Sequence, residues 1–226
     1  MTILKAAARV FRTRGFAAAG MREIAIAADL SPGNLYHYFR GKDELLFFCQ
    51  DRSLDRLLAA LARVRRDPRP MAERLHDLAV AHVLCLLDDV DGSAAHLEVH
   101  ALPPQLLARI VAKRDRYERG VRALVGSGIR RGLLRASEPT ISTRAFLGAL
   151  NWTASWYRPE GSDAPESVAN LVAEFAVAGL APNTGVDRPD RQRGTRRGDV
   201  SAVQDAPRDS PRGAESVRHK AWLRAR

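Results

Sequence analysis

Apolar side chains recur at helical spacing in a series of separate segments along this 226-residue chain. Within each segment they lie three or four positions apart, which places them on one face of a helix. Proline-rich breaks separate several segments, because proline cannot continue a helix. The pattern predicts an all-α fold with helices over residues 2–14, 21–27, 31–40, 43–65, 71–87, 94–101, 105–131, 139–157 and 165–180.

The second and third of these predicted helices are short and are joined by a tight turn. Ser31 is suited to cap the third helix by accepting a hydrogen bond from a free backbone N–H group, and Pro32 suits the first helical position. Gly41 is predicted to terminate this helix. Leu35 and Phe39 are four residues apart and therefore share its buried face. This arrangement predicts a helix-turn-helix unit whose second helix reads DNA.

The outward face of this reader helix carries polar and aromatic side chains and no acid. Asn34 and Tyr38 are the candidates for base edges, because an amide can pair with adenine and a phenol can contact bases or methyl groups. Tyr36 is assigned to a phosphate, as is His37 if it faces the DNA backbone. Gly33 allows the start of the helix to approach DNA closely.

The run IAIAADLSPGNLYHYFRGKDEL, preceded by ILKAAARVFRTRGF, resembles the DNA-binding domain of the TetR family of bacterial transcriptional regulators. The resemblance covers residues 3–50 and implies a homodimer that binds a roughly palindromic operator on double-stranded DNA. Lys42 resembles the family lysine that contacts a phosphate, and Arg22 should take another phosphate. The predicted DNA-binding residues are therefore Arg22, Ser31, Pro32, Gly33, Asn34, Tyr36, His37, Tyr38 and Lys42.

The chain departs from the family pattern in three places. Asp29 occupies the turn position where glycine is usual, and aspartate tolerates a left-handed backbone better than most residues. Gly20 stands where Thr or Ser usually opens the first short helix, and glycine is the weaker cap. The basic arm that many members carry before the first helix is missing here, so minor-groove contacts are not expected unless the true start lies upstream.

The sequence predicts three parts with different roles. Residues 1–45 form the helix-turn-helix DNA-binding domain, and residues 46–181 form a helical ligand-binding and dimerisation domain. Residues 182–226 alternate Arg, Asp, Gly, Pro and Ser with few large apolar side chains, which predicts a disordered basic tail. Its arginines would add salt-sensitive, sequence-independent DNA affinity, or the tail is an inert extension; the composition favours neither.

A second resemblance concerns GALNW at residues 148–152 and WYRPEG at residues 156–161. These runs are similar to the C-terminal segment of TetR regulators that control lipid catabolism, many of which bind acyl-CoA thioesters. The same aromatics suit a dimer interface, and the family pairs its last two helices with their copies in a four-helix bundle. We favour dimer packing for most of them. The resemblance implies a homodimer through the last two helices.

Composition narrows the remaining classes of function. The formal charge of +10 fits a polyanionic partner, although much of the excess lies in the predicted tail. Cys49 and Cys85 stand in apolar helical runs, which is typical of buried thiols in a reducing cytoplasm. No apolar run reaches the roughly 20 residues that a membrane span needs. We therefore expect a cytoplasmic protein that is associated with the nucleoid when bound to DNA and has no membrane partner.

Signals of catalysis and of metal binding are weak or absent in the sequence. It contains no nucleophile elbow, no phosphate-binding glycine loop and no paired acids on a strand scaffold. His96 and His100 flank Glu98 but lack the H-E-x-x-H spacing, and residues 88–92 lack the spacing of a calcium loop. We predict no enzymatic activity, no cofactor and no metal.

These observations predict a sequence-specific transcriptional regulator that acts as a repressor. A small, largely apolar or acyl-CoA-type ligand would bind among the body helices and release the protein from its operator. The sequence does not assign the ligand-binding residues. The alternative is an activator, or a regulator that depends on a partner protein and has no small-molecule effector.

Overall fold

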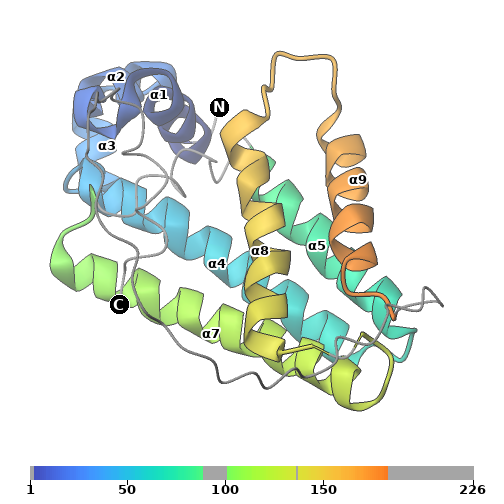
Figure 1. The fold of residues 1–226 in the computed structure, drawn as a ribbon. Helices are drawn as coiled ribbons and strands as arrows, with labels where there is room; N and C mark the ends of the chain where they lie inside the picture. The colour runs from blue at the N-terminus through green and yellow to red at the C-terminus, as the bar shows by residue number, and fades with distance from the viewer. Residues whose placement is uncertain (1–2, 89–100, 136, 183–226) are drawn as a thin grey trace, which may run out of the picture. The chain divides into compact units, whose positions relative to one another are not determined.

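The computed structural model describes residues 3–88, 101–135 and 137–182. Within these ranges every regular element is a helix, as the sequence predicts, and no strand occurs. The predicted helix at 94–101, with His96 and His100, lies almost wholly outside the described residues, as does the predicted tail. The helices are α1 (Ile3–Ala18), α2 (Met21–Ala27), α3 (Pro32–Tyr38), α4 (Lys42–Arg66), α5 (Met71–Leu87), α7 (Pro104–Arg130), α8 (Pro139–Trp156) and α9 (Pro165–Ala178) (Figure 1).

Most helix boundaries agree with the sequence pattern, and two differ for local reasons. α1 continues past its predicted end to Ala18, across a kink at Gly15, where φ is 73°. The prediction that Gly41 terminates the reader helix is wrong. α3 ends at Tyr38, with Phe39 as its extended C-terminal cap. Gly41 has φ −178°, which is ordinary extended backbone, and it is the N-terminal cap of α4.

The first three helices form a unit around a small apolar core, here called the three-helix unit (residues 3–38). α2 packs against both α1 and α3, and α1 also contacts α4. Phe11, Ile24 and Leu35 contribute one fully buried side chain from each helix. α2 and α3 have 7 residues each and are too short to be stable alone in water, so this shared core is what holds α3 in place.

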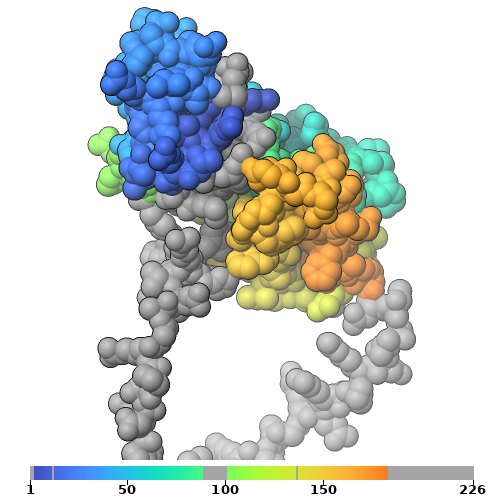
Figure 2. Space-filling view, turned by 90° about the horizontal axis from the view of Figure 1, so that it is seen from above, coloured from blue at the N-terminus to red at the C-terminus, as the bar shows by residue number. Residues whose placement is uncertain are grey.

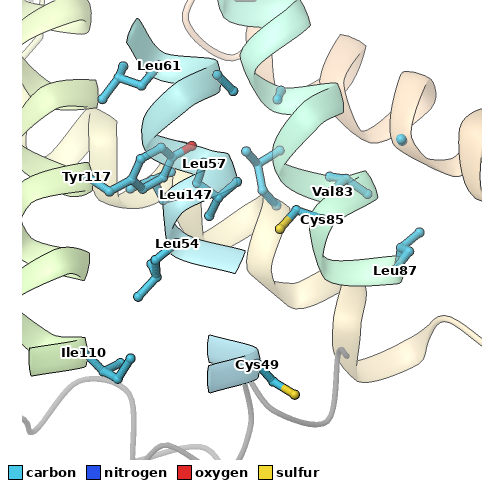
Figure 3. Packing of buried hydrophobic residues seen from close by; sticks show 14 of the residues in the cluster. Cys49, Leu54, Leu57, Leu61, Val83, Cys85, Leu87, Ile110, Tyr117 and Leu147 are labelled. Atoms are coloured by element: carbon cyan, nitrogen blue, oxygen red, sulfur yellow. The ribbon is translucent and has the colours of Figure 1, made fainter. Parts of the chain in front are cut away.

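The remaining helices form a larger body around α5. α5 packs against α4, α8 and α9, and α7 packs against α4 and α8 (Figure 1). The close view shows Tyr117 of α7 reaching toward Leu57 of α4 and Leu147 of α8, with Cys85 of α5 nearby (Figure 3). Cys49 and Cys85 are both buried, as the sequence predicts.

α4 belongs to both regions, because it contacts α1 at its beginning and the body helices along its length. Ion pairs fix its register against the body. Lys113 of α7 lies 2.7 Å from Asp51 and 2.8 Å from Asp55. Arg56 lies 2.6 Å from Asp88, just beyond the end of α5.

Among the described helices, none is both long and apolar enough to cross a lipid bilayer.

Candidate nucleic-acid interface

The turn between α2 and α3 is closed by a left-handed residue. Asp29 has φ 60°, as the sequence analysis expected for this position. Its N–H donates to the Ile26 carbonyl at 3.1 Å, and the Leu30 N–H donates to the Ala25 carbonyl at 2.9 Å. These two bonds satisfy the last free carbonyls of α2 in the way that helices commonly end. The turn therefore forms without glycine and sets the direction of α3.

α3 begins as the sequence predicts. The Ser31 side chain accepts a hydrogen bond from the Asn34 N–H at 3.2 Å, and Pro32 occupies the first helical position. Leu35 is fully buried beneath the helix, and Phe39 is partly buried behind it. The cap and the buried leucine together fix both the start of α3 and its rotation about its own axis.

The opposite face of α3 is open to solvent. Tyr36 is 55% exposed and Tyr38 is 65% exposed, and Asn34 and His37 are also exposed. A side chain added at Gly33 would meet only the Ser31 hydroxyl, at 4.0 Å, so the start of the helix can lie close to another molecule. The structure thus brings the predicted base-reading and phosphate-binding side chains of α3 onto one accessible surface.

Arg22 and Lys42 were also predicted to contact phosphates, and they differ in their surroundings. Arg22, at the start of α2, is exposed. Lys42 is partly buried, and its ammonium donates to the carbonyl oxygens of Phe16 at 3.0 Å and Ala17 at 2.9 Å. It also lies 4.8 Å from the centre of the Phe16 ring. Sequence reasoning missed this contact, because no local pattern indicates which carbonyls a distant lysine will meet.

A second group that the sequence reasoning missed lies in the body, where three buried or half-buried polar residues from different helices meet. Nδ1 of His82 on α5 lies 3.1 Å from the Tyr117 hydroxyl on α7. Nε2 of His82 lies 3.2 Å from Oδ1 of Asn151 on α8. Because the amide oxygen only accepts, Nε2 carries the hydrogen and Nδ1 accepts from the tyrosine. No local sequence pattern identifies these partners, because they lie 35 and 69 positions from His82 in the chain.

Burial keeps this histidine neutral. Burial lowers the pKa of His82 from 6.5 to about 4, and the hydrogen bond with Asn151 opposes this only in part. Burial also raises the pKa of the Tyr117 hydroxyl well above its usual range. The three residues are therefore an uncharged hydrogen-bonded link between α5, α7 and α8 at physiological pH.

The buried histidine predicts a loss of stability in mild acid. The unfolded chain binds a proton at His82 below about pH 6.5, whereas the folded chain binds it only near pH 4, so the free energy of unfolding falls as the pH falls through this window. We expect His82 to account for a loss of about 2 kcal/mol between pH 7.5 and pH 5. Urea unfolding at both pH values, at one protein concentration, measures the loss.

A His82→Gln variant should lose about 2 kcal/mol less between the two pH values than the wild type, because it has no proton to bind at this position. His76→Gln is the matched control, since His76 lies on the same helix and its side chain is 30% exposed. An equal loss in the wild type and in His82→Gln would contradict the assignment.

The outer surface of α8 and α9 is apolar and aromatic. Trp152 and Trp156 of α8, with Leu171 and Phe175 of α9, are exposed large side chains, and Phe175 is 76% exposed. They line a shallow hollow of about 330 Å³ between the two helices. Figure 2 shows the surfaces of α8 and α9 side by side. Leu171 and Phe175 are thus uncovered within one chain.

Both the three-helix unit and the helical body resemble known protein families. Residues 3–47 match the bacterial regulatory proteins of the tetR family, and residues 68–180 match the tetracyclin repressor-like C-terminal domain. The HTH-type transcriptional repressor KstR2 of Mycobacterium tuberculosis is 25% identical over 185 residues, covering 79% of this chain and 90% of KstR2. The HTH-type transcriptional activator FasR of Mycolicibacterium smegmatis is 32% identical over 109 residues, covering 48% of this chain and 50% of FasR.

A solved structure agrees along most of the chain. The crystal structure of AibR in complex with isovaleryl coenzyme A and operator DNA matches with a TM-score of 0.66 and 27% identity, covering 79% of this chain and 96% of AibR. The matches extend over the three-helix unit and the helical body alike. The chain therefore belongs to the TetR family of bacterial regulators and is a sequence-specific DNA-binding regulator of transcription.

Proposed function

We propose that this regulator is a homodimeric repressor that leaves its operator when a CoA thioester with an apolar acyl group binds its body. The observation that carries the DNA-reading part is the exposed face of α3, with Asn34, Tyr36, His37 and Tyr38 on one surface. Because Leu35 and the Ser31 cap fix the rotation of α3 about its axis, these side chains are preorganised on the exposed face without DNA. Phosphate-contacting groups would set the register, and Asn34 and Tyr38 would read bases.

The proposed dimer forms through α8 and α9. Exposed aromatic and aliphatic side chains in one contiguous patch mark a protein interface more often than a solvent surface. Trp152 and Phe175 would fill the hollow of the partner, so that each surface matches a second copy of itself. Two reader helices must then lie about 34–36 Å apart to enter successive major grooves, which requires a roughly palindromic operator. Residues 1–45 would read DNA and residues 46–181 would dimerise and bind ligand.

The proposed effector follows from the relatives and from the body. AibR was crystallised with isovaleryl coenzyme A and operator DNA, and the body of this chain is built from apolar faces of α4, α5, α7 and α8. A ligand that binds better to a dimer with the wrong reader spacing shifts the population away from DNA. The proposed place of action is the cytoplasm, where the operator lies.

The test is fluorescence anisotropy with DNA from upstream of the protein's own gene and a scrambled control. We expect the upstream fragment to bind at least tenfold more tightly at physiological salt, because base contacts add to phosphate contacts. Isovaleryl-CoA, a longer acyl-CoA and free CoA are then titrated into the complex. Release by an acyl-CoA and not by free CoA supports the proposed effector class. Binding to the upstream DNA that no thioester reverses would contradict it.

The activator reading has one specific observation in its favour, the similarity to FasR over about half of the chain. Transcription from the upstream promoter in a purified system separates the two. A repressor lowers the transcript level when it is added and restores it with ligand. An activator raises the transcript level from the same DNA.

A further inference from the structure

Arg114 stands on the face of α7 that packs against the rest of the body. Ile110, four residues earlier, and Tyr117, three residues later, share this face and are both buried. Both point from α7 into the body (Figure 3). Arg114 is itself partly buried, whereas Arg116, on the other side of the helix, is exposed. The fold therefore places a guanidinium in a stripe that otherwise carries apolar and aromatic side chains.

The charge of Arg114 is not balanced within the described part of the chain. Its natural partner on the helix would be Glu118, four residues later. Glu118 instead lies 3.5 Å from Arg122 and 3.7 Å from Arg144. Among the described residues no hydrogen bond or ion pair involves the Arg114 side chain, and burial lowers its pKa to about 10. An arginine with this pKa keeps its positive charge at pH 7.

An unbalanced cation in this position costs stability. Removal of a guanidinium from water is unfavourable unless an opposite charge or several hydrogen bonds replace the water. Lys113, the preceding residue, has that compensation, because carboxylates of Asp51 and Asp55 lie 2.7 and 2.8 Å from its ammonium. Arg114 has no comparable partner in the described ranges. Charged groups that are unbalanced in a protein interior are typical of binding sites, where a ligand supplies the missing charge.

The surroundings of Arg114 on this face are neutral. Tyr117, one turn along α7, donates to Nδ1 of His82, and Nε2 of His82 donates to Asn151. None of these three side chains carries a charge at pH 7, so they do not compensate the guanidinium. The buried faces of α5, α7 and α8 are otherwise largely apolar. A ligand that matches this environment has one anionic group and an apolar remainder.

We propose that Arg114 binds the anionic group of the effector, a carboxylate or a phosphate, while the apolar part of the effector lies against the body helices. The planar guanidinium suits both anions, because its N–H donors can contact two oxygens of either group at once. A CoA thioester supplies phosphates, and a free carboxylic acid supplies a carboxylate. The inference rests on the proposed function, since it takes the body as the effector site, and it adds the residue that recognises the effector's charge.

The first test compares the thermal stability of Arg114→Met and Arg116→Met without ligand, at one protein concentration. Methionine keeps an unbranched apolar side chain and removes the charge, and Arg116 is the matched control because it is exposed on the same helix. We expect Arg114→Met to raise the Tm by about 2–4 °C, because an unbalanced charge leaves the interior. Arg116→Met should change the Tm by less than about 2 °C. A Tm of Arg114→Met at or below the wild-type value would overturn the proposal.

The second test is calorimetric titration of the protein, without DNA, with octanoyl-CoA, octanoate and the uncharged methyl octanoate. The three probes share the apolar chain and differ in charge. We expect at least one of the two anions to bind the wild type, and the ester to bind at least about tenfold more weakly. Arg114→Met should lose at least about tenfold in affinity for each anion that binds, and Arg116→Met should keep the wild-type affinity. Binding of octanoate identifies a carboxylate as sufficient, and binding of octanoyl-CoA alone identifies the phosphates.

These titrations also separate the inference from the proposed function. Equal affinity of the wild type and Arg114→Met for octanoyl-CoA would overturn the inference and leave the proposed effector class standing. Arg114-dependent binding of octanoate, without binding of octanoyl-CoA, would support the inference and contradict the CoA part of the proposed function. Binding of neither anion to the wild type would overturn the inference, whatever the protein does on DNA.

Discussion

A Phe175→Glu variant is expected to be monomeric and to bind its operator at least about a hundredfold more weakly than the wild type. Phe175 is 76% exposed in the single chain and stands on the outer face of α9. In the proposed dimer it is buried against a second copy, where an unpaired carboxylate is strongly disfavoured. A monomer has one reader helix, so it loses the high effective concentration that the first half-site gives to the second.

Light scattering after size-exclusion chromatography measures the mass, and anisotropy on the same sample measures the affinity. Leu133→Glu is the control. Leu133 is also a large apolar side chain that is exposed, at 42%, but it lies in the turn after α7 and not on α8 or α9. The control should remain dimeric with wild-type affinity. A Phe175→Glu protein that kept the mass of a dimer would exclude α8 and α9 as the interface.

Leu35→Ala is expected to loosen the three-helix unit and to abolish operator binding while the body stays folded and dimeric. Leu35 is fully buried beneath the reader helix. Truncation of a buried leucine costs about 2–5 kcal/mol, through lost burial and the cavity that remains. The three-helix unit has a small core and cannot absorb such a loss as a larger domain can.

The measurement is hydrogen exchange over residues 3–38 and over α5, with chromatography to confirm the dimer. Ile26→Ala is the matched control, since Ile26 is 71% exposed on α2 and its truncation should change stability by less than about 0.5 kcal/mol. We expect faster exchange in the three-helix unit of Leu35→Ala alone. Unchanged protection there would mean that α3 is held by contacts other than the core beneath it.

Local signals made much of the DNA-reading helix predictable. Ser31 and Pro32 indicate the start of a helix, because a capping hydroxyl and a proline at the first position act within one helical turn. The structure confirms both the Ser31 cap and the position of Pro32. Asp29 in the left-handed conformation was likewise predictable, because few residues tolerate that backbone. The wrong boundary at Gly41 arose because glycine serves either end of a helix. Which end it serves depends on whether φ is positive, and the sequence alone does not state that.

Contacts between distant residues were not predictable in this way. Lys42 meets carbonyls 26 and 25 residues earlier, and His82 meets Tyr117 and Asn151 at separations of 35 and 69 residues. Helical periodicity says which face of a helix is buried but not which other helix covers it. The same limit applied to Phe175, whose apolar character was clear while its exposure in the single chain was not.

The sequence by itself determined the all-helical class, the helix-turn-helix and the family, because capping, turn chemistry and periodicity are encoded in neighbouring residues. Only the tertiary structure decided that Lys42 faces inward, that a neutral histidine joins three body helices, and that α8 and α9 leave an aromatic surface uncovered. The physical reason is that these features depend on how helices pack. Packing is set by the summed shape and burial of many side chains far apart in the chain.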